Sequence, residues 1–145
     1  KYLPQYDSAP KDFKLYRLFK VFKLNWDTFS ERFEDFLIYK NYKFGNLSGG
    51  QRRFIETYII LKTKSEIVFL DEPFNGISPL MIEGVKALIT EEKIKKILVV
   101  TDHKYEDVIN ISDNLYLLNN GTTKLINKFS ELEDYGYLSE NQIPI

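Results

Sequence analysis

Two apolar runs of strand length, in "EIVFL" (66–70) and "KILVV" (96–100), constrain the fold most strongly. Neither run alternates with polar residues, which is typical of strands buried on both faces of a sheet. A helix-length segment separates them. It begins at Ser78-Pro79 and should extend to about Glu92, because Pro is favoured in the first helical turn. The order strand, helix, strand predicts an α/β fold with a parallel sheet.

The first half of the chain has a different pattern. "KYLPQ" is typical of a strand that ends in a loop, and apolar residues then recur at helical spacing. We expect a helix after Pro10, a second over residues 28–40 with Asp27 as its N-cap, and a third from Ser48 to about Thr63. Residues 1–62 are therefore predicted to form a mostly helical subdomain, and residues 63–145 the C-terminal part of an α/β core.

The last third predicts a short helix and a hairpin. The helix is expected in "KYEDVINI", after the second apolar run. "NLYLL" and "TKLIN" flank Asn119-Asn120-Gly121, and Asn-Gly between two apolar runs is typical of a tight β-hairpin turn.

Composition excludes several classes of protein. The 145 residues suit one domain or two small lobes sharing a core. A formal charge of −1 provides no basic field for nucleic acid, and no apolar run approaches the length of a membrane span. The absence of cysteine excludes disulfides and thiolate metal sites.

The stretch "LSGGQ" (47–51) lies at the predicted start of the third helix. The Ser48 hydroxyl can cap this helix, and Gly49 and Gly50 leave backbone N–H groups uncovered. The positive end of the helix dipole then favours an anion, most naturally phosphate. An ordinary capped helix after a Gly-rich turn is the simpler interpretation of any one Ser-Gly pair, but it explains the whole pentapeptide less well.

Acidic residues follow the first buried strand. Asp71 and Glu72 stand at its C-terminal end, where ligands bind in open α/β sheets. One carboxylate can hold Mg²⁺, and its neighbour can activate a water nucleophile. A solvated turn that uses Asp, Glu and Pro is the alternative.

Two more polar residues follow predicted strands. His103 is the only histidine of the chain and is expected at the same sheet edge as Asp71 and Glu72. Gln5 lies where "YLPQ" leaves its strand. Taken alone, each is more simply an exposed loop residue.

Taken together and in this order, these pieces resemble the nucleotide-binding domain of ATP-binding cassette (ABC) proteins. "LSGGQRR" is similar to the signature motif, "IVFLDEP" to the Walker B strand with its glutamate, "TDH" to the switch-histidine loop and "YLPQ" to the Q-loop. "DEPFNGISP" and "TDHKYEDV" look closest to subunits for lipopolysaccharide export or branched-chain amino-acid uptake.

The resemblance implies roles in ATP hydrolysis. Asp71 would hold Mg²⁺, with Gln5 sensing the ion and the attacking water. Glu72 would be the general base, and His103 would contact the γ-phosphate and orient Glu72. In phosphoryl transfer such positioning and charge neutralisation do most of the work.

The resemblance also implies a composite site. Ser48, Gly50 and Gln51, with Gly49 in the same stretch, would clasp ATP held by the second nucleotide-binding domain of a head-to-tail dimer. Ser78 stands at the D-loop position facing that partner, where the family usually has Asp. Further implied partners are a transmembrane permease and, for location, the cytoplasmic face of the cell membrane.

One family element is missing from the sequence. A P-loop needs G-x-x-x-x-G-K-[ST], and none of the seven glycines precedes a lysine. We expect the phosphate cradle upstream of Lys1. The chain would then be the C-terminal part of an ABC transporter ATPase and would not bind ATP alone.

Two other functions stay open. A non-transport ABC ATPase of DNA repair or translation would carry a coiled-coil insertion or a basic surface, neither of which is evident. A non-catalytic helical interaction module would use the aromatic residues of the first two helices, although core packing explains most of these residues.

Overall fold

The computed structural model describes residues 1–128 and 130–134. They belong to two compact units, Lys1–His103 and Lys104–Ile145, which are described separately below. The division expected after residue 62 falls inside the first unit, between a helix and a strand. The end of the chain, where the family resemblance is weakest, includes residues 135–145, which lie outside the described residues.

A parallel sheet of three strands organises the first unit. Its order is β1 (Tyr2–Leu3), β2 (Ile67–Asp71) and β3 (Ile97–Thr101). In the register of β2 with β3, Asp71 lies opposite Thr101, so the carboxyl ends of the strands meet at one edge. The predicted α/β fold with parallel strands is confirmed.

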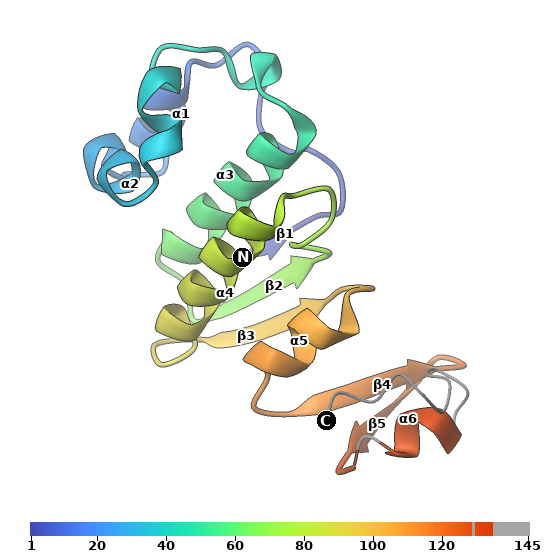
Figure 1. Cartoon of the computed structure of the whole chain (residues 1–145). Coiled ribbons are helices and arrows are strands. Elements are labelled where there is room, and N and C mark those ends of the chain that lie inside the picture. The colour runs from blue at the N-terminus through green and yellow to red at the C-terminus, as the bar shows by residue number, and fades with distance from the viewer. Residues whose placement is uncertain (129, 135–145) are drawn as a thin grey trace. The chain divides into compact units, whose positions relative to one another are not determined.

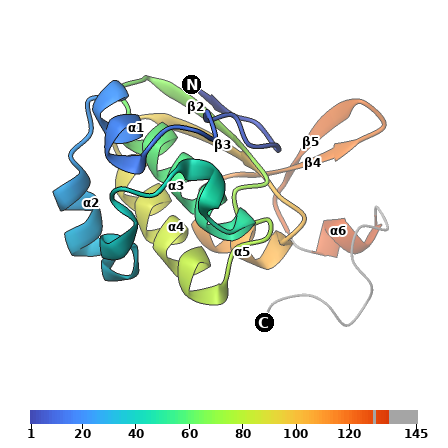
Figure 2. The same cartoon turned by 90° about the horizontal axis from the view of Figure 1, so that it is seen from above.

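Two long helices cover one face of this sheet. In Figures 1 and 2, α3 (Gly49–Lys62) and α4 (Pro79–Glu92) lie side by side against the strands. Both begin at predicted serine caps: Ser48 accepts a hydrogen bond from Gln51 N, and Ser78 from Met81 N. The predicted starts and ends of these helices are confirmed.

The two faces of the sheet differ in exposure. Leu3, Val68 and Leu70 point toward the helices and are buried. The other face, which we call the outward face, is exposed and apolar; it carries Tyr2, Ile67, Phe69, Ile97 and Val99. The prediction that the strands are buried on both faces is therefore wrong for the described residues, because α3 and α4 lie on only one side.

An aromatic cluster holds the helical part of the first unit together. This helical part contains α1 (Leu15–Val21), α2 (Trp26–Arg32) and two short 3₁₀ helices, η1 (Glu34–Tyr39) and η2 (Phe44–Asn46). Phe29 is fully buried and contacts the rings of Phe19, Trp26, Phe33, Phe36, Phe54 and Tyr58. Core packing therefore explains these aromatic residues.

Three details of the predicted helices are wrong. Pro10 is not in a helix, because its carbonyl accepts Phe13 N–H in a turn and α1 begins only at Leu15. Asn25, not Asp27, caps α2, because the Asn25 side chain accepts the N–H groups of Asp27 and Thr28. The helix predicted over residues 28–40 is interrupted at Phe33, whose non-helical backbone (φ −123°, ψ 74°) separates α2 from η1.

The second unit contains α5 (Tyr105–Ile111), β4 (Leu115–Asn119), β5 (Thr122–Ile126) and α6 (Ser130–Asp134). Strands β4 and β5 form the predicted antiparallel hairpin. Asn120 and Gly121, with φ of 49° and 76°, make its turn, which is the conformation that Asn-Gly favours.

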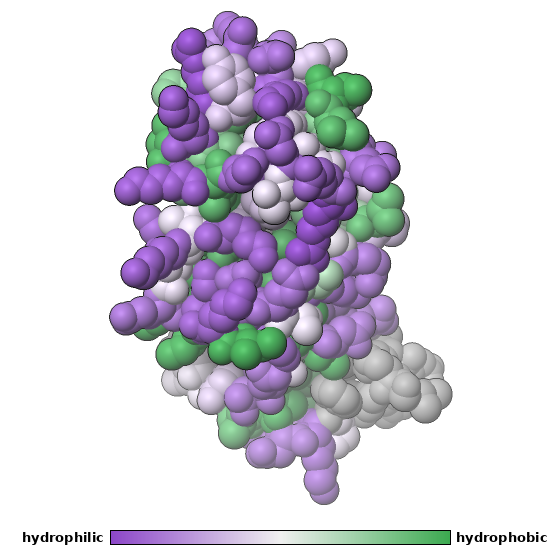
Figure 3. All heavy atoms as spheres, turned by 90° about the vertical axis from the view of Figure 1, so that its left-hand side faces the viewer, coloured by the Kyte–Doolittle hydropathy of each residue, from purple (hydrophilic) through white to green (hydrophobic). Residues whose placement is uncertain are grey.

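The side of the first unit that lies at the left of Figure 1 has no large continuous hydrophobic patch. Figure 3 shows this side as mostly hydrophilic, with small, separate hydrophobic patches. In the part of the chain that the structure describes, no helix has both the length and the apolar character needed to cross a membrane.

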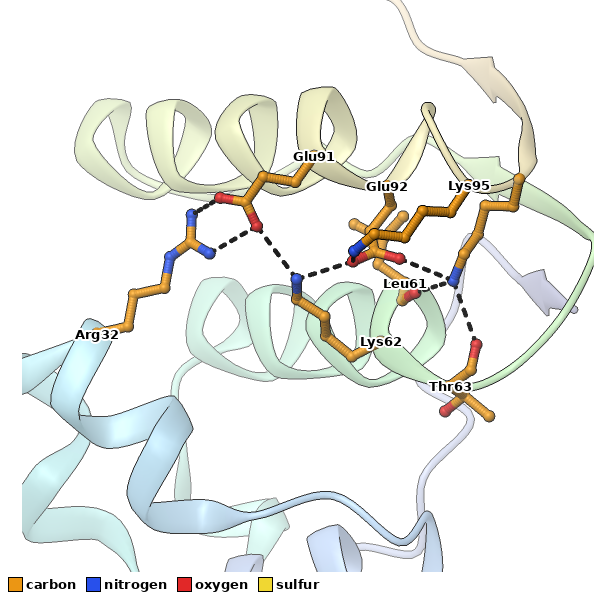
Figure 4. A network of polar contacts seen from close by, with 8 residues as sticks. Arg32, Leu61, Lys62, Thr63, Glu91, Glu92 and Lys95 are labelled. Carbon is orange, nitrogen blue, oxygen red and sulfur yellow. Dashed lines mark hydrogen bonds and ion pairs between the residues drawn. The ribbon is translucent and has the colours of Figure 1, made fainter.

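A charge network joins the ends of α3 and α4 (Figure 4). Glu91 pairs with Arg32 of α2 and with Lys62, and Lys62 also contacts Glu92 at 2.9 Å. Glu92 is buried and also pairs with Lys96, whose ammonium donates to the carbonyls at the end of α3. The network fixes the C-terminal ends of both helices at the entrance to β3.

This network predicts a pH dependence of stability. The hydrogen bond from Arg32, and that from Lys62, lower the pKa of Glu91 from 4.5 to about 2. A depressed folded-state pKa gives stability that is present above pH 4.5 and is lost as the pH falls toward 2. Because 42% of the Glu91 side chain is exposed, solvent screens these ion pairs, and we expect Glu91→Gln to lower the free energy of unfolding at pH 7 by about 1 kcal/mol or less.

Urea unfolding of both proteins between pH 7 and pH 2 measures this effect. The gap between wild type and Glu91→Gln should close as the pH falls through the range between the two pKa values. A gap of constant size would contradict the assignment.

Candidate functional site

Asp71 lies at the carboxyl edge of the sheet, at the end of β2. Its Oδ1 accepts a hydrogen bond from Thr101 Oγ1 at 2.8 Å, and its Oδ2 accepts one from Tyr2 OH at 3.1 Å. The bond to Asp71 raises the pKa of Tyr2, so this hydroxyl stays protonated and donates. Three neighbouring strands therefore hold the orientation of one carboxylate.

Glu72 follows in an unusual backbone conformation. Its φ is +52°, in the left-handed region that is uncommon for residues other than glycine. Its N–H donates to Thr101 O at 2.7 Å, so β3 stabilises this conformation. Such strained residues concentrate at functional sites.

The Glu72 carboxylate is surrounded by polar side chains. Gln5 Nε2 donates to its Oε2 at 2.9 Å, and His103 Nε2 lies 2.9 Å from its Oε1. Asn75 Nδ2 donates to the same Oε2 at 3.0 Å. We call these four residues the Glu72 cluster. The expectation that His103 lies at the same sheet edge as Glu72 is met in the structure, and Gln5 lies there too.

Asn75 was missed by the sequence analysis. It lies three positions after Glu72 in the turn that leads to α4, and its own N–H donates to Glu72 O at 3.1 Å. An amide in a turn carries no distinctive motif. The signal that could have found it is its spacing, since a turn brings residue i+3 back to residue i.

The second group of candidate residues forms the start of α3. Ser48 and Gln51 make a reciprocal capping box: Gln51 N donates to Ser48 Oγ at 3.1 Å, and Ser48 N to Gln51 Oε1 at 3.0 Å. Among the described residues, no hydrogen bond or ion pair links Ser48 or Gln51 to the Glu72 cluster. The two groups therefore have separate hydrogen-bond networks within one unit.

The two glycines of this stretch have different surroundings. A Cβ on Gly50 would lie 2.5 Å from Gly76 O and 3.3 Å from Ile77 Cα, so close packing of two backbones requires glycine there. A Cβ on Gly49 would meet only the end of Arg52 at 3.9 Å. Packing within the chain therefore does not require glycine at position 49.

The candidate residues fit a phosphate and, in part, a magnesium ion. Backbone N–H groups at the start of a 14-residue helix suit an anion. No group of three or more His, Cys, Asp or Glu side chains among the described residues could hold a metal ion. Asp71 can supply one oxygen ligand, and Mg²⁺ would need phosphate, water or other protein groups for the rest.

Ser78 is the N-cap of α4. Its hydroxyl caps α4 by accepting Met81 N–H at 3.4 Å, and Pro79 occupies the first turn. It stands at the end of the turn whose Gly76 and Ile77 pack against Gly50.

Arg53 is a further residue that the sequence analysis did not single out. It is 5% exposed and donates to the backbone carbonyls of Pro4, Asp71 and Glu72. It joins α3 to both strand ends that carry the cluster. Arg53 belongs to the "LSGGQRR" run, but an arginine that follows another arginine in the sequence gives no sign that it is buried.

Comparison with known proteins gives relatives of one kind. A "probable ABC transporter ATP-binding protein" of Azorhizobium caulinodans is 34% identical over 77 residues, 52% of this chain. The lipopolysaccharide export ATP-binding protein LptB of Acidithiobacillus ferridurans is 31% identical over 90 residues, 61% of the chain. The probable branched-chain amino acid transport protein LivG of Methanocaldococcus jannaschii is 34% identical over 80 residues, 54% of the chain.

The chain spans only 27%, 37% and 31% of the lengths of these relatives, and no protein-family model matches it. The similarity therefore covers part of each relative. LptB and LivG are named for lipopolysaccharide export and branched-chain amino acid transport, the two types of subunit that the sequence resembled most.

Solved structures give the same fold. The ATP-binding subunit of an ABC transporter matches with a TM-score of 0.71 at 17% identity, covering 94% of this chain and 62% of that one. A structure named RNase-L Inhibitor matches with a TM-score of 0.68 at 21% identity, covering 86% and 26%. The resemblance to ABC nucleotide-binding domains is confirmed, and the fold is that of part of such a domain.

The surroundings of the glycines predict that Gly49 and Gly50 differ in their effect on stability. Gly50→Ala should lower the free energy of unfolding by about 1–3 kcal/mol, because its methyl group would meet backbone atoms that cannot move independently. Gly49→Ala is the matched control and should change it by less than about 0.5 kcal/mol. Urea unfolding of the two variants measures both values, and equal effects would contradict the difference in packing between the two positions.

Proposed function

We propose that the chain is the C-terminal part of the ATP-binding subunit of an ABC transporter, which hydrolyses ATP to power transport across a membrane. The observation that carries this proposal is the Glu72 cluster. A strained glutamate with an amide and an imidazole on its carboxylate stands at the carboxyl edge of a parallel sheet. This arrangement suits a general base that orients water for attack on a phosphoryl group.

In this proposal each residue has a defined role. Glu72 accepts the proton of the attacking water. Gln5 and Asn75 donate to the carboxylate oxygen Oε2 and orient it. His103, whose side chain is 87% exposed and whose Nε2 lies 2.9 Å from Oε1, would contact the γ-phosphate. Asp71 would supply one ligand to the Mg²⁺ that accompanies ATP, and that ion would neutralise phosphate charge.

The start of α3 has its role in a second site. Ser48, Gly49, Gly50 and Gln51 would contact the γ-phosphate of an ATP bound to another subunit in a head-to-tail dimer. No hydrogen bond joins Ser48 or Gln51 to the Glu72 cluster among the described residues, which is compatible with contacts to two different phosphates. Ser78 would face the same partner, without the negative charge of the usual Asp.

Transport is favoured over the other functions by three considerations. LptB and LivG, two of the sequence relatives, are named for transport functions. The formal charge of −1 gives no net positive charge to attract nucleic acid. The aromatic residues of the first two helices are largely core residues, which weakens the case for an independent helical interaction module. The subunit would act with a transmembrane permease, in the cytoplasm at the inner face of the membrane.

The missing P-loop predicts that the 145-residue chain alone does not bind Mg-ATP with micromolar affinity. The start of α3 offers N–H groups and a dipole but no lysine and no loop around the β- and γ-phosphates. Isothermal titration of the folded chain with Mg-ATP measures this, with a P-loop ATPase as the positive control. A Kd in the micromolar range would contradict the proposal.

The general-base role predicts the effect of Glu72→Gln in the complete protein, whose coding sequence upstream of Lys1 should encode a P-loop. Turnover should fall at least about 100-fold, because the amide cannot accept a proton, while ATP binding persists. Glu66→Gln, at the exposed opposite end of β2, is the matched control and should keep wild-type turnover. Wild-type turnover in Glu72→Gln, or a different domain upstream, would contradict the assignment.

A further inference from the structure

Glu56 is a charged residue in the core. It lies in the second turn of α3 and is 3% exposed. A carboxylate is costly to bury unless other groups compensate its charge and its hydrogen-bonding capacity. Its contacts should therefore show what it does there.

The contacts of Glu56 all lie on one short loop. Its Oε1 accepts hydrogen bonds from Ser8 N at 2.8 Å, Ala9 N at 2.8 Å and Ser8 Oγ at 3.2 Å. The loop is outside every helix and strand, so these N–H groups have no secondary-structure partner. The other oxygen, Oε2, has no hydrogen-bond partner among the described residues. The carboxylate therefore serves the loop through one oxygen.

Arg53 holds the same loop at its other end. It lies three residues before Glu56, on the same face of the helix, and donates to Pro4 O. Gln5 lies between the two attachments, at the residue after Pro4, and its amide reaches Glu72 Oε2. One helix thus fixes the backbone on both sides of Gln5.

A weaker contact joins the loop and helix in between. Arg52 Nε donates to Asp7 Oδ2 at 2.6 Å, but both side chains are more than 20% exposed. Exposed ion pairs contribute less than charge-assisted hydrogen bonds in the core. Glu56 therefore dominates the hold on the C-terminal side of the loop.

We propose that Glu56 is a positioning residue that sets the placement of Gln5 against Glu72. Its catalytic meaning rests on the proposed function, because it acts through Gln5 and touches no reacting group. In this proposal α3 has two roles. Its N-terminus presents Ser48 and Gly49, and Glu56 in its second turn holds the loop that follows Gln5. Displacement of the helix at the first site would then shift Gln5 at the second.

The test uses ¹⁵N-labelled 145-residue chain and NMR spectroscopy, without nucleotide. In Glu56→Ala, hydrogen exchange of the Ser8 and Ala9 amides should accelerate about tenfold or more, because their acceptor is lost. The side-chain amide signals of Gln5 should move toward those of a free glutamine. Glu56→Gln keeps the volume and an acceptor oxygen and should restore the Gln5 signals. Glu56→Met fills a similar volume without an acceptor and should not restore them, whereas a purely steric role of residue 56 predicts that it would.

Arg52→Ala is the matched control. It removes the Asp7 ion pair from the same loop and should leave the Gln5 signals in place. If Glu56→Ala does not fold, Ala9→Pro removes one donor from the loop side, leaves the helix intact and should shift the Gln5 signals in the same way.

Two results would overturn the proposal: unchanged Gln5 signals in the folded Glu56→Ala or Ala9→Pro chain, or an equal shift in Arg52→Ala. Because no ATP is present, these results are independent of the proposed function. A failure of the ATPase assignment would appear only in the titration and turnover experiments.

Discussion

The buried guanidinium of Arg53 is the interaction on which the arrangement of the first unit depends. It donates to the carbonyls of Pro4, Asp71 and Glu72, where two strands of the sheet end. Burial lowers the pKa of Arg53, and the nearby carboxylates, led by Glu56, oppose this effect. A guanidinium keeps its charge under such conditions and presents several donors in a fixed plane. It therefore satisfies carbonyls that strand pairing leaves open and fixes both strand ends relative to α3.

The sequence predicted the parts of the site that follow from chain direction and helix capping. Parallel strands bring their carboxyl ends to one edge, so Asp71, Glu72 and His103 were expected together. The starts of α3 and α4 were predicted because Ser48 and Ser78 have side chains that satisfy free N–H groups. These rules depend only on neighbouring residues in the sequence and on strand order, which can be predicted without the structure.

Other features depend on contacts between distant residues. Asn25 and Asp27 are both good N-caps by residue type, and the structure uses Asn25, whose side chain accepts the N–H groups of Asp27 and Thr28. The burial of Arg53 and Glu56 is equally hidden, because charged residues near a helix start usually face solvent. An apolar strand sequence likewise does not say whether one or both faces will be covered.

The outward face of the sheet gives the first unit an amphiphilic character. Two exposed residues of β2, Ile67 and Phe69, lie beside two of β3, Ile97 and Val99, while the helical side carries charged networks. A protein unit with one apolar face and one charged face behaves as a surfactant. The chain should adsorb at air–water interfaces and on hydrophobic resins, and mild detergents should wet this face and keep the chain dispersed during handling.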